Sequence, residues 1–391
     1  MRPWIEARLS GWVEPEGGGR LRPAGATLAL VRPHVASMGI TRLADITGLD
    51  RVGVSVVMAV RPEARAVAVS LGKGLSLDAA RAGALMESLE TWHAERIGLP
   101  LRLASLAELE AAGEDVLDVE RLAKAAPLPF PRERRLLWVR GDDAAGTGHP
   151  WLPFEAVHTD YAEGGPPASG VLRMTSNGLA SGNHPLEALE AALLEVVERD
   201  ATRRFEALGP DGRKARCLDL DGVAAPGCRE LLARIGAAGL PVRAFDLTAP
   251  RGTPAVMALV GSAPGEDVPP CQGQAARADP ADALQGALLE ALQTRLTFIA
   301  GARDDLERDS YGREAVVEAV RRAAPLLGAR PCRPLPPGPE PAPLPARLEA
   351  LIAGLEAAEC LRVGVVELPA LVPGVAVLRV LVPGLGMTGG G

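Results

Sequence analysis

Apolar and polar residues alternate in several short segments of the chain, and this two-residue period predicts β-strands. The segments that show it are residues 52–62, 66–71, 135–141, 241–247, 254–261, 362–368 and 376–384. Other segments repeat their apolar positions every three or four residues, as helices do. We expect helices over 27–39, 78–97, 108–122, 312–327 and 344–359, and within the blocks 176–208 and 271–305.

The blocks at 72–97, 176–208 and 271–305 share an order in which a Gly-rich stretch precedes a long helix. These stretches read GKGLS, SNGLASGN and CQGQAARADP. We interpret them as turns, with Ser76 and Asn183 as helix N-caps, because Ser and Asn side chains accept hydrogen bonds from the first backbone N–H groups. Such turns are natural anion cradles, since the N–H groups there point outward.

Each of these helices also has acidic or amide residues one turn apart on a face of small residues. At 100° per residue, the polar stripe spans roughly 60 to 80° on each helix. The stripes contain Glu87 and Glu90, then Glu187, Glu195 and Glu198, then Glu290 and Gln293. A solvated polar face is the ordinary interpretation of such a stripe. Three narrow stripes with few lysines favour instead a shared magnesium site, because clustered carboxylates repel unless a cation joins them.

Composition excludes several functional classes. The 391 residues have a net charge of −7 and no long basic run, so we expect no binding to nucleic acid. We find no signal peptide and no apolar stretch of membrane-spanning length, and we expect a cytoplasmic protein. The five cysteines show no CxxC spacing. We interpret each as a small, reduced, buried residue, and a nucleophilic Cys271 is the minor alternative.

The cations near the acidic stripes have two interpretations. Lys73 is either a surface lysine or a phosphate contact. Arg199, Arg295 and Arg303 either form ion pairs with the carboxylates or stabilise transferring phosphoryl charge. No Walker A motif and no GxSxG elbow is present, so neither a P-loop nor an α/β-hydrolase site is expected.

The three blocks together resemble the ATP-site motifs of the YcaO family. GKGLSLDAARAGALMESLETWHAER is similar to its first motif, SNGLASGNHPLEALEAALLEVVERDA to its second and GALLEALQTRLTFIAGARDD to its third. The segment GITRLADITGLDRVGVSVVMAVRP resembles the branch that works with a TfuA partner. The likeness covers residues 30–310, in the right order. It implies an α/β (α+β) fold without a P-loop, with mixed, largely antiparallel sheets packed against the motif helices.

The resemblance also implies a site for ATP and Mg²⁺. Its Mg²⁺ ligands would be Glu87, Glu90, Glu195, Glu198 and Glu290. Its ATP contacts would be Lys73, Glu87, Asn183, Glu187, Arg199, Gln293 and Arg303, with Arg199, Gln293 and Arg295 as catalytic residues. Gly83 departs from the family, whose first motif usually has Ser there. We expect an N-terminal segment at 1–50, followed by the ATP-binding catalytic domain at 51–330. A proline-rich linker at 331–345 would then lead to a helix-and-strand segment at 346–391 that completes this domain.

The implied chemistry is ATP-dependent O-phosphorylation of a peptide backbone amide. With sulfide the product is a thioamide, and with a Cys, Ser or Thr side chain it is an azoline. The TfuA-type branch favours thioamide formation, and the C-terminus lacks the PxPxP ending of many azoline-forming members. A non-catalytic scaffold that binds a peptide or a partner is the alternative from another class. The expected partners are a peptide or protein substrate, a TfuA-like protein and a second copy of the chain.

Overall fold

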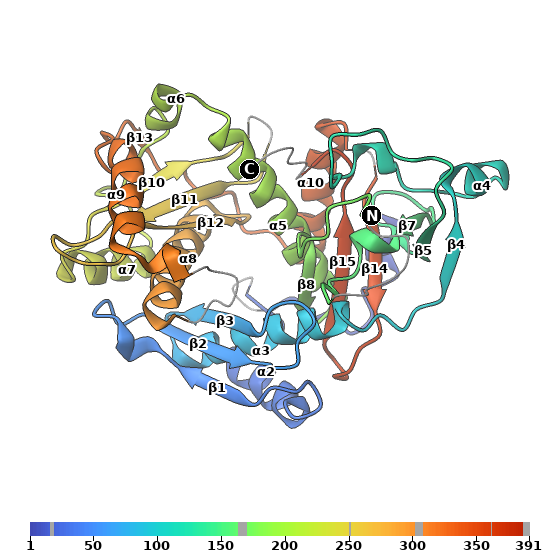
Figure 1. The fold of residues 1–391 in the computed structure, drawn as a ribbon, viewed down its shortest axis with the longest axis horizontal. Coiled ribbons are helices and arrows are strands. Elements are labelled where there is room, and N and C mark those ends of the chain that lie inside the picture. Colours follow the sequence, from blue (N-terminus) through green and yellow to red (C-terminus); the bar gives the residue numbers. More distant parts are fainter. Residues whose placement is uncertain (16–18, 163–169, 250–251, 302–307, 361, 386–391) are drawn as a thin grey trace.

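The computed structural model describes residues 1–15, 19–162, 170–249, 252–301, 308–360 and 362–385. Its strands form five sheets, and three of these are each covered by one long helix. The three sheet–helix layers surround the centre of the molecule (Figure 1). All strand pairings in the described ranges are antiparallel except that of β13 (Arg333–Pro334) with β9 (Leu218–Asp219). The predicted mixed, largely antiparallel α/β fold is confirmed.

The first layer is formed by residues near the N-terminus. Its strands, in the order β1–β2–β3, are Arg42–Asp45, Ser55–Val60 and Val69–Gly74. Helix α3 (Leu77–Ala94) follows β3 and packs on β2 and β3, and α2 (Ala24–Val31) packs on α3. Ser76 caps α3 as predicted, because its hydroxyl accepts a hydrogen bond of 3.2 Å from the backbone N–H of Ala79.

The second layer is built in the same way. Its strands, in the order β10–β11–β12, are Val242–Asp246, Ala255–Val260 and Cys271–Ala276. Helix α8 (Pro280–Ala300) packs on β11 and β12, with α7 (Pro226–Ala237) against α8 and α9 (Arg313–Leu327) against β10. The strand predicted within 254–261 is confirmed as β11, but the alternation assigned to it is wrong: every residue of β11 is buried, and its sequence AVMALV is a continuous apolar run.

The third layer joins the middle of the chain to its end. Its sheet has the order β6–β14–β15–β8, from Asp142–Asp143, Gly364–Leu368, Ala376–Leu381 and Leu179–Gly182. Helix α5 (Pro185–Glu206) follows β8 and packs on β8 and β15, and α10 (Leu344–Ala357) packs on α5. The C-terminal strand β15 therefore lies directly beside β8, which precedes the second motif helix.

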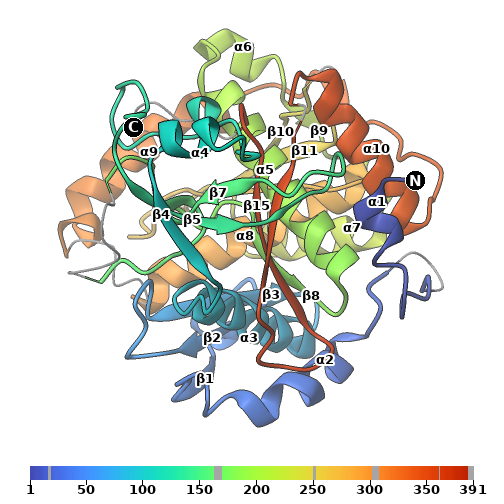
Figure 2. The ribbon, with the colours of Figure 1, turned by 90° about the vertical axis from the view of Figure 1, so that its right-hand side faces the viewer.

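The remaining elements lie around these layers. Figure 2 shows a separate sheet, β4–β5–β7, with α4 beside it. Its strands are Leu101–Ala104, Leu136–Arg140 and Trp151–Pro153, and α4 is Leu106–Ala111. Short helices α1 and α6 cover Pro3–Glu6 and Pro210–Lys214. Single 3-10 turns occupy Arg32–His34, Thr47–Leu49, Val119–Arg121, Phe154–Ala156 and Arg308–Tyr311.

The Gly-rich stretches were predicted as turns, which holds for Gly178, at a positive φ of 79°, but is wrong for most of the other glycines. Gly72, Gly182 and Gly273 lie in strands β3, β8 and β12, against the helix that follows each strand. A Cβ at Gly72 would lie 1.8 Å from the carbonyl oxygen of Ala80, and one at Gly273 would lie 2.2 Å from the amide nitrogen of Ala291. These glycines therefore permit close packing of strand on helix and do not form anion cradles.

Other local predictions also needed correction. The N-cap of α5 is His184 rather than Asn183, because the His184 ring accepts a hydrogen bond of 3.2 Å from the N–H of Leu186. The helix predicted over 108–122 ends at Ala111, before Gly113, which has a positive φ of 67°. The helix predicted over 27–39 covers only 24–31, followed by a 3-10 turn that contains Pro33, which lacks the N–H needed to continue an α-helix.

Two predictions from composition can be compared with the structure. Four of the five cysteines are buried, as predicted, but Cys332 is exposed. None of the helices in the described ranges is both long and apolar enough to cross a bilayer.

The close strand–helix contact predicts a large stability effect of one methyl group. Gly273→Ala should destabilise the protein by about 1 to 3 kcal/mol or more, because both atoms nearest the new Cβ are backbone atoms that cannot move aside. Urea unfolding followed by circular dichroism measures the change. The control is Gly236→Ala on α7, where the Cβ meets nothing within 4 Å and alanine favours the helix. Equal stability of both variants would contradict the packing argument.

Candidate active site

The predicted acidic residues from three helices come together at the centre of the three layers. Glu90 of α3 accepts hydrogen bonds from the backbone N–H and the hydroxyl of Ser181 in β8, at 2.7 and 2.6 Å. Glu198 of α5 accepts one of 3.3 Å from the N–H of Ala276 in β12. The first contact joins the first layer to the third, and the second contact joins the third layer to the second.

An ion pair completes this circle. Lys73 Nζ in β3 lies 2.8 Å from Glu290 Oε2 on α8, so the first and second layers are joined as well. Glu87 accepts a hydrogen bond of 2.9 Å from the N–H of Leu71, within its own layer. We call Glu87, Glu90, Glu195, Glu198 and Glu290 the acidic ring. The prediction that these side chains share one site agrees with this geometry.

The acidic ring has unusual protonation equilibria. Burial raises the pKa of Glu87 to about 6, and of Glu195 and Glu198 to about 7. The pKa of Glu90 rises to about 8 for the same reason, and the charges of Glu87 and Glu195 raise it further. Glu290 differs, because Lys73 holds its pKa below the usual range despite burial. Lys73 therefore compensates Glu290, and the charge of Arg199 partly opposes the rise in pKa at Glu195 and Glu198.

This donor set fits a magnesium ion. Mg²⁺ prefers carboxylate oxygens and usually completes its octahedron with water and substrate phosphates. Glu87, Glu90 and Glu198 each use one oxygen for the hydrogen bonds given above, and the other oxygen accepts none from the described residues. Within the described ranges no three such side chains already have the geometry of a metal site. That fits Mg²⁺ held by one or two carboxylates together with a nucleotide.

Arg199 provides a second cation at the ring. Its guanidinium lies 3.7 Å from Glu195 Oε1, and its side chain is 58% exposed. The long distance and the exposure leave this arginine free to reorient towards a phosphate. Gln293 is partly buried on α8, one turn after Glu290. The position of Gln293 at the ring therefore stays a prediction from its spacing on α8.

Asn183 and Glu187 lie at the start of α5, in contact with the N-terminal segment. Glu187 accepts hydrogen bonds from the backbone N–H groups of Leu21 and Asn183, the latter at 2.8 Å. The Asn183 side-chain oxygen accepts one of 3.0 Å from the hydroxyl of Thr27. The structure thus gives both side chains a role in fixing residues 21–27 against α5.

Arg295 does not join the acidic ring. It is buried on another face of α8, where it pairs with Asp50 at 3.1 Å and with Glu266. On a helix, a residue five positions after Glu290 is rotated by about 140°, so this arginine cannot share its stripe. The predicted catalytic contact is replaced by an internal ion pair. Arg303 lies outside the described residues.

Cys271 and Gly83 can also be assessed. Burial raises the pKa of the Cys271 thiol to about 12, so it stays protonated and a nucleophilic role is disfavoured. A Cβ at Gly83 would lie 3.2 Å from the Cα of Gly72. Gly83 therefore lies where helix α3 closely contacts strand β3. Its small size lets these two backbones approach each other, and it does not leave space for a ligand.

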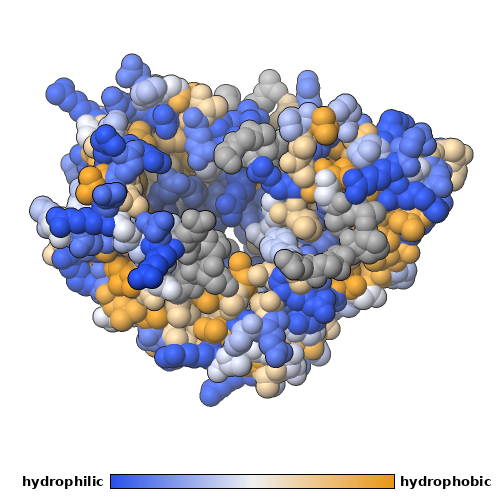
Figure 3. All heavy atoms as spheres, viewed as in Figure 1, coloured by the Kyte–Doolittle hydropathy of each residue, from blue (hydrophilic) through white to orange (hydrophobic). Residues whose placement is uncertain are grey.

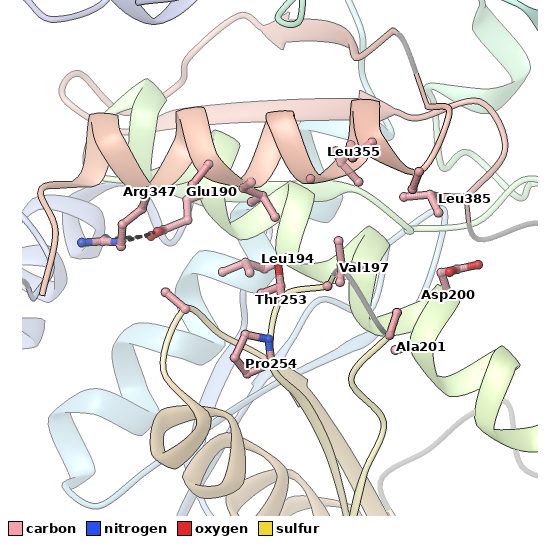
Figure 4. A pocket seen from close by; sticks show the side chains of 18 of the residues that line it. Glu190, Leu194, Val197, Asp200, Ala201, Thr253, Pro254, Arg347, Leu355 and Leu385 are labelled. Carbon is pink, nitrogen blue, oxygen red and sulfur yellow. Dashed lines mark hydrogen bonds and ion pairs between the residues drawn. The ribbon is translucent and has the colours of Figure 1, made fainter. Parts of the chain in front are cut away.

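Two cavities flank helix α5. The smaller one, of 460 Å³, is lined by Glu198 and Arg199 and therefore adjoins the acidic ring. The larger one, of 690 Å³, lies between a different face of α5, with Leu194 and Val197, and helix α10, with Leu355 (Figure 4). Hydrophilic residues line a hollow near the middle of the face in Figure 3, in the region that the three layers surround.

Sequence reasoning missed two polar residues at the smaller cavity, Asn177 and Arg379. Arg379 is buried in β15, between apolar neighbours. A charged residue inside the run AVLRVLV was the signal that could have identified it, because a buried charge needs a specific reason. Asn177 lies in the stretch SNGLASGN, of which the sequence analysis used only Asn183.

Most of this chain matches a protein-family model. The family model described as "YcaO cyclodehydratase, ATP- and Mg²⁺-binding" matches residues 71–386. The chain belongs to the YcaO family. The match includes β3 with Lys73, all three ring helices and β15. ATP and Mg²⁺, the cofactors predicted from the sequence, are those of the family.

A curated relative points to the same branch as the sequence did. This chain is 33% identical over 293 residues to an uncharacterized protein in the tfuA 3' region of Rhizobium leguminosarum bv. trifolii. The aligned part covers 73% of this YcaO chain and 69% of the relative. The place of this relative in a tfuA region agrees with the predicted resemblance to the TfuA-associated branch.

Solved structures share the fold. The YcaO protein from Methanopyrus kandleri, bound with AMPPCP and Mg²⁺, superposes with a TM-score of 0.72 at 23% identity, over 95% of this chain and 93% of that one. A heterocyclase in complex with substrate and cofactor gives a TM-score of 0.78 at 21% identity. That match covers 97% of this chain but only 54% of the heterocyclase.

The raised pKa of Glu90 predicts a pH dependence of stability without ligand. In the unfolded chain its pKa is near the ordinary 4.5, so the folded protein binds the proton more tightly between that pH and about 8. This contribution is complete below pH 4.5 and is lost as the pH rises towards 8. The Glu90→Gln variant has no carboxyl to lose this proton. The free energy of unfolding of the variant minus that of the wild type should therefore rise by about 1.4 kcal/mol per pH unit between pH 4.5 and about 8.

Chemical denaturation between pH 5 and 8.5 measures this difference. The matched control is Glu63→Gln, at an exposed position, whose stability should follow that of the wild type at every pH. Parallel curves for wild type and Glu90→Gln would mean that Glu90 is not held protonated by its surroundings.

Proposed function

We propose that this YcaO protein uses ATP and Mg²⁺ to activate a backbone amide of a ribosomally made peptide or a protein, and that the product is a thioamide. The observation that supports this most is the acidic ring, in which carboxylates from three helices meet beside one lysine and one exposed arginine. ATP with Mg²⁺ would supply the phosphoryl group that converts the amide oxygen into a leaving group.

Each residue of the site has a role in this proposal. The Mg²⁺ ligands would come from the acidic ring (Glu87, Glu90, Glu195, Glu198 and Glu290), one or two carboxylates on an ion together with the nucleotide, and the crowding of these carboxylates would make that binding favourable. Lys73 stays between Glu290 and the phosphates, and Arg199 turns from Glu195 to phosphoryl oxygens, with Gln293 as a polar contact beside them. Asn183 and Glu187 fix the start of α5 through residues 21–27. Positioning and electrostatics then provide most of the rate enhancement.

The identity of the product divides two hypotheses. The relative named for the tfuA 3' region favours a thioamide, with a TfuA-like partner that delivers sulfur. The family description as a cyclodehydratase favours an azoline, formed with a Cys, Ser or Thr side chain. We place the thioamide first, because the segment at 39–62 also resembles the TfuA-associated branch. A homodimer in the cytoplasm is part of the same proposal.

A scaffold without catalysis is the alternative that Gly83 supports. A chain that only binds a peptide or partner would not need carboxylates with unpaired oxygens around a lysine. The acidic ring therefore favours an enzyme.

Turnover distinguishes the enzyme from the scaffold. Glu87→Gln and Glu198→Gln should fold normally and lower ATP turnover by about 100-fold or more, because each removes a ligand of the metal that stabilises transition-state charge. Phosphate release from ATP is measured with Mg²⁺, a candidate substrate peptide and a TfuA-like protein. The control is Glu230→Gln, the same change in an exposed ion pair on α7. Normal turnover in both ring variants would reject the assignment.

The mass of the modified peptide separates the two enzymatic hypotheses. A thioamide is heavier than the amide by the difference between sulfur and oxygen, whereas an azoline is lighter by one water. We expect the heavier product, and only when the TfuA-like protein is present. A lighter product formed without it would replace the thioamide by the azoline.

A further inference from the structure

The larger cavity beside α5 takes no part in the proposed ATP chemistry. Its volume of 690 Å³ is typical of a ligand pocket, and most of its lining is apolar. Leu194 and Val197 line it from α5, and Leu351 and Leu355 line it from α10. Small residues complete the wall on the α10 side, namely Ala346, Ala350, Gly354, Ala357 and Ala358. Their side chains are too short to fill the space between the helices.

The cavity is long and follows the two helices. On α5 its lining extends from Glu190 to Arg204, a stretch of helix that rises about 20 Å. Figure 4 shows the ion pair of Glu190 with Arg347 at one end, and Asp200 with Leu385 at the other. An extended peptide advances by about 3.3 Å per residue, so the cavity has the length of about six residues.

Acidic groups without a partner lie at both ends of this cavity. Both lining arginines pair with a lining carboxylate, namely Arg347 with Glu190 at 2.8 Å and Arg204 with Asp200 at 2.5 Å. The carboxylates of Glu340 and Glu359 also line the cavity and have no hydrogen bond or ion pair within the described ranges. Glu340 precedes α10 and Glu359 follows it. A ligand that complements these walls is therefore apolar in its middle and cationic at its ends.

Glu359 occupies a strained position. Its φ of 63° is positive, as for no other non-glycine residue in the part of the chain that the structure describes. The N–H of Cys360 donates to the carbonyl oxygen of Leu355 at 3.0 Å, and the N–H of Glu359 to that of Glu356 at 2.9 Å. This is the Schellman pattern, in which glycine is the usual residue at the position of Glu359. Strain of this kind is typical of binding sites.

The larger cavity adjoins the smaller one at the Glu359 end. Leu385 lines both cavities, and Glu198 of the acidic ring lines the smaller one. Arg121 connects Leu385 with Glu359, because its guanidinium donates to the Glu359 carbonyl oxygen and its own carbonyl oxygen accepts from the N–H of Gly384, both at 2.8 Å. A chain that leaves the larger cavity at this end therefore reaches the wall of the cavity beside the acidic ring.

We propose that the larger cavity binds an extended apolar segment of the substrate peptide, about six residues long, with a lysine or arginine at each end that pairs with Glu340 or Glu359. A peptide suits the cavity better than a free amphipathic amine, because two acidic ends call for two cations and the smaller cavity continues the path. This inference rests on the proposed function, because it names a part of the peptide substrate that is recognised away from the reacting amide.

Binding of three short peptides to the full chain tests the inference, by calorimetry without ATP. The first is acetyl-Lys-Leu-Ala-Leu-Ala-Lys-amide. The second has Glu in place of both lysines, and the third has Ser in place of both leucines. We expect the first to bind at least about tenfold more tightly than either of the others, because each of those lacks the charge or the apolar contacts that the cavity complements.

Variants place the probe in the cavity. Ala350→Trp puts an indole into it and should abolish binding of the first peptide. The matched control is Ala353→Trp, an exposed position of α10 outside the cavity lining, which should bind like wild type. Glu359→Gln should weaken binding about threefold. Glu359→Gly should weaken it equally and also raise the urea midpoint of unfolding, because glycine adopts a positive φ without strain.

Equal binding of the three peptides by wild type, or unchanged binding of the first by Ala350→Trp, would overturn the inference. A wild-type dimer that Ala350→Trp dissociates in sedimentation equilibrium would also overturn it, since a second copy of the chain would then fill the cavity. Peptide-dependent ATP turnover without binding of the first peptide would reject this inference alone. Selective binding by a wild-type chain that turns over no ATP would reject the proposed function and retain the peptide-binding cavity.

Discussion

The burial of several carboxylates at one place, with their mutual repulsion added to it, is the constraint on which this structure depends. Glu87, Glu90, Glu195 and Glu198 are close enough to affect one another, and only Glu290 has a direct lysine partner. Isolated helices would not hold such charges together. The fold does so because each helix is fixed to a sheet through glycine contacts that leave no room for a side chain.

The three cross-layer contacts explain how distant parts of the chain act as one site. Glu90 reaches β8, Glu198 reaches β12 and Lys73 reaches α8. In each case a group of the site is also the link between two layers. A change in the charge of the site, by protonation or by a bound cation, therefore acts directly on the contacts that hold the layers together. This coupling is the physical basis for expecting that ligand binding orders the centre of the molecule.

Much of this arrangement could be predicted from the sequence, because helical periodicity is a local property. The stripes with Glu87, Glu90, Glu195, Glu198 and Glu290 follow from the rotation of 100° per residue alone. The role of the glycines could not be predicted this way, since Gly in a turn and Gly under a helix look alike in sequence. Arg295 pairs with Asp50, 245 residues earlier in the chain, and with Glu266, 29 residues earlier. Only the tertiary fold brings these residues together. The same holds for Arg379, whose strand lies beside β8.

The central claim is that Mg²⁺ with a nucleotide displaces protons from the acidic ring. Calorimetry in buffers of different ionisation enthalpy counts those protons when Mg²⁺ and a non-hydrolysable ATP analogue bind at about pH 7, near the raised pKa values. The same titration of Glu90→Gln subtracts the protons that come from the nucleotide. We predict that wild type releases more protons than Glu90→Gln. Equal release, with normal binding in both, would contradict the account.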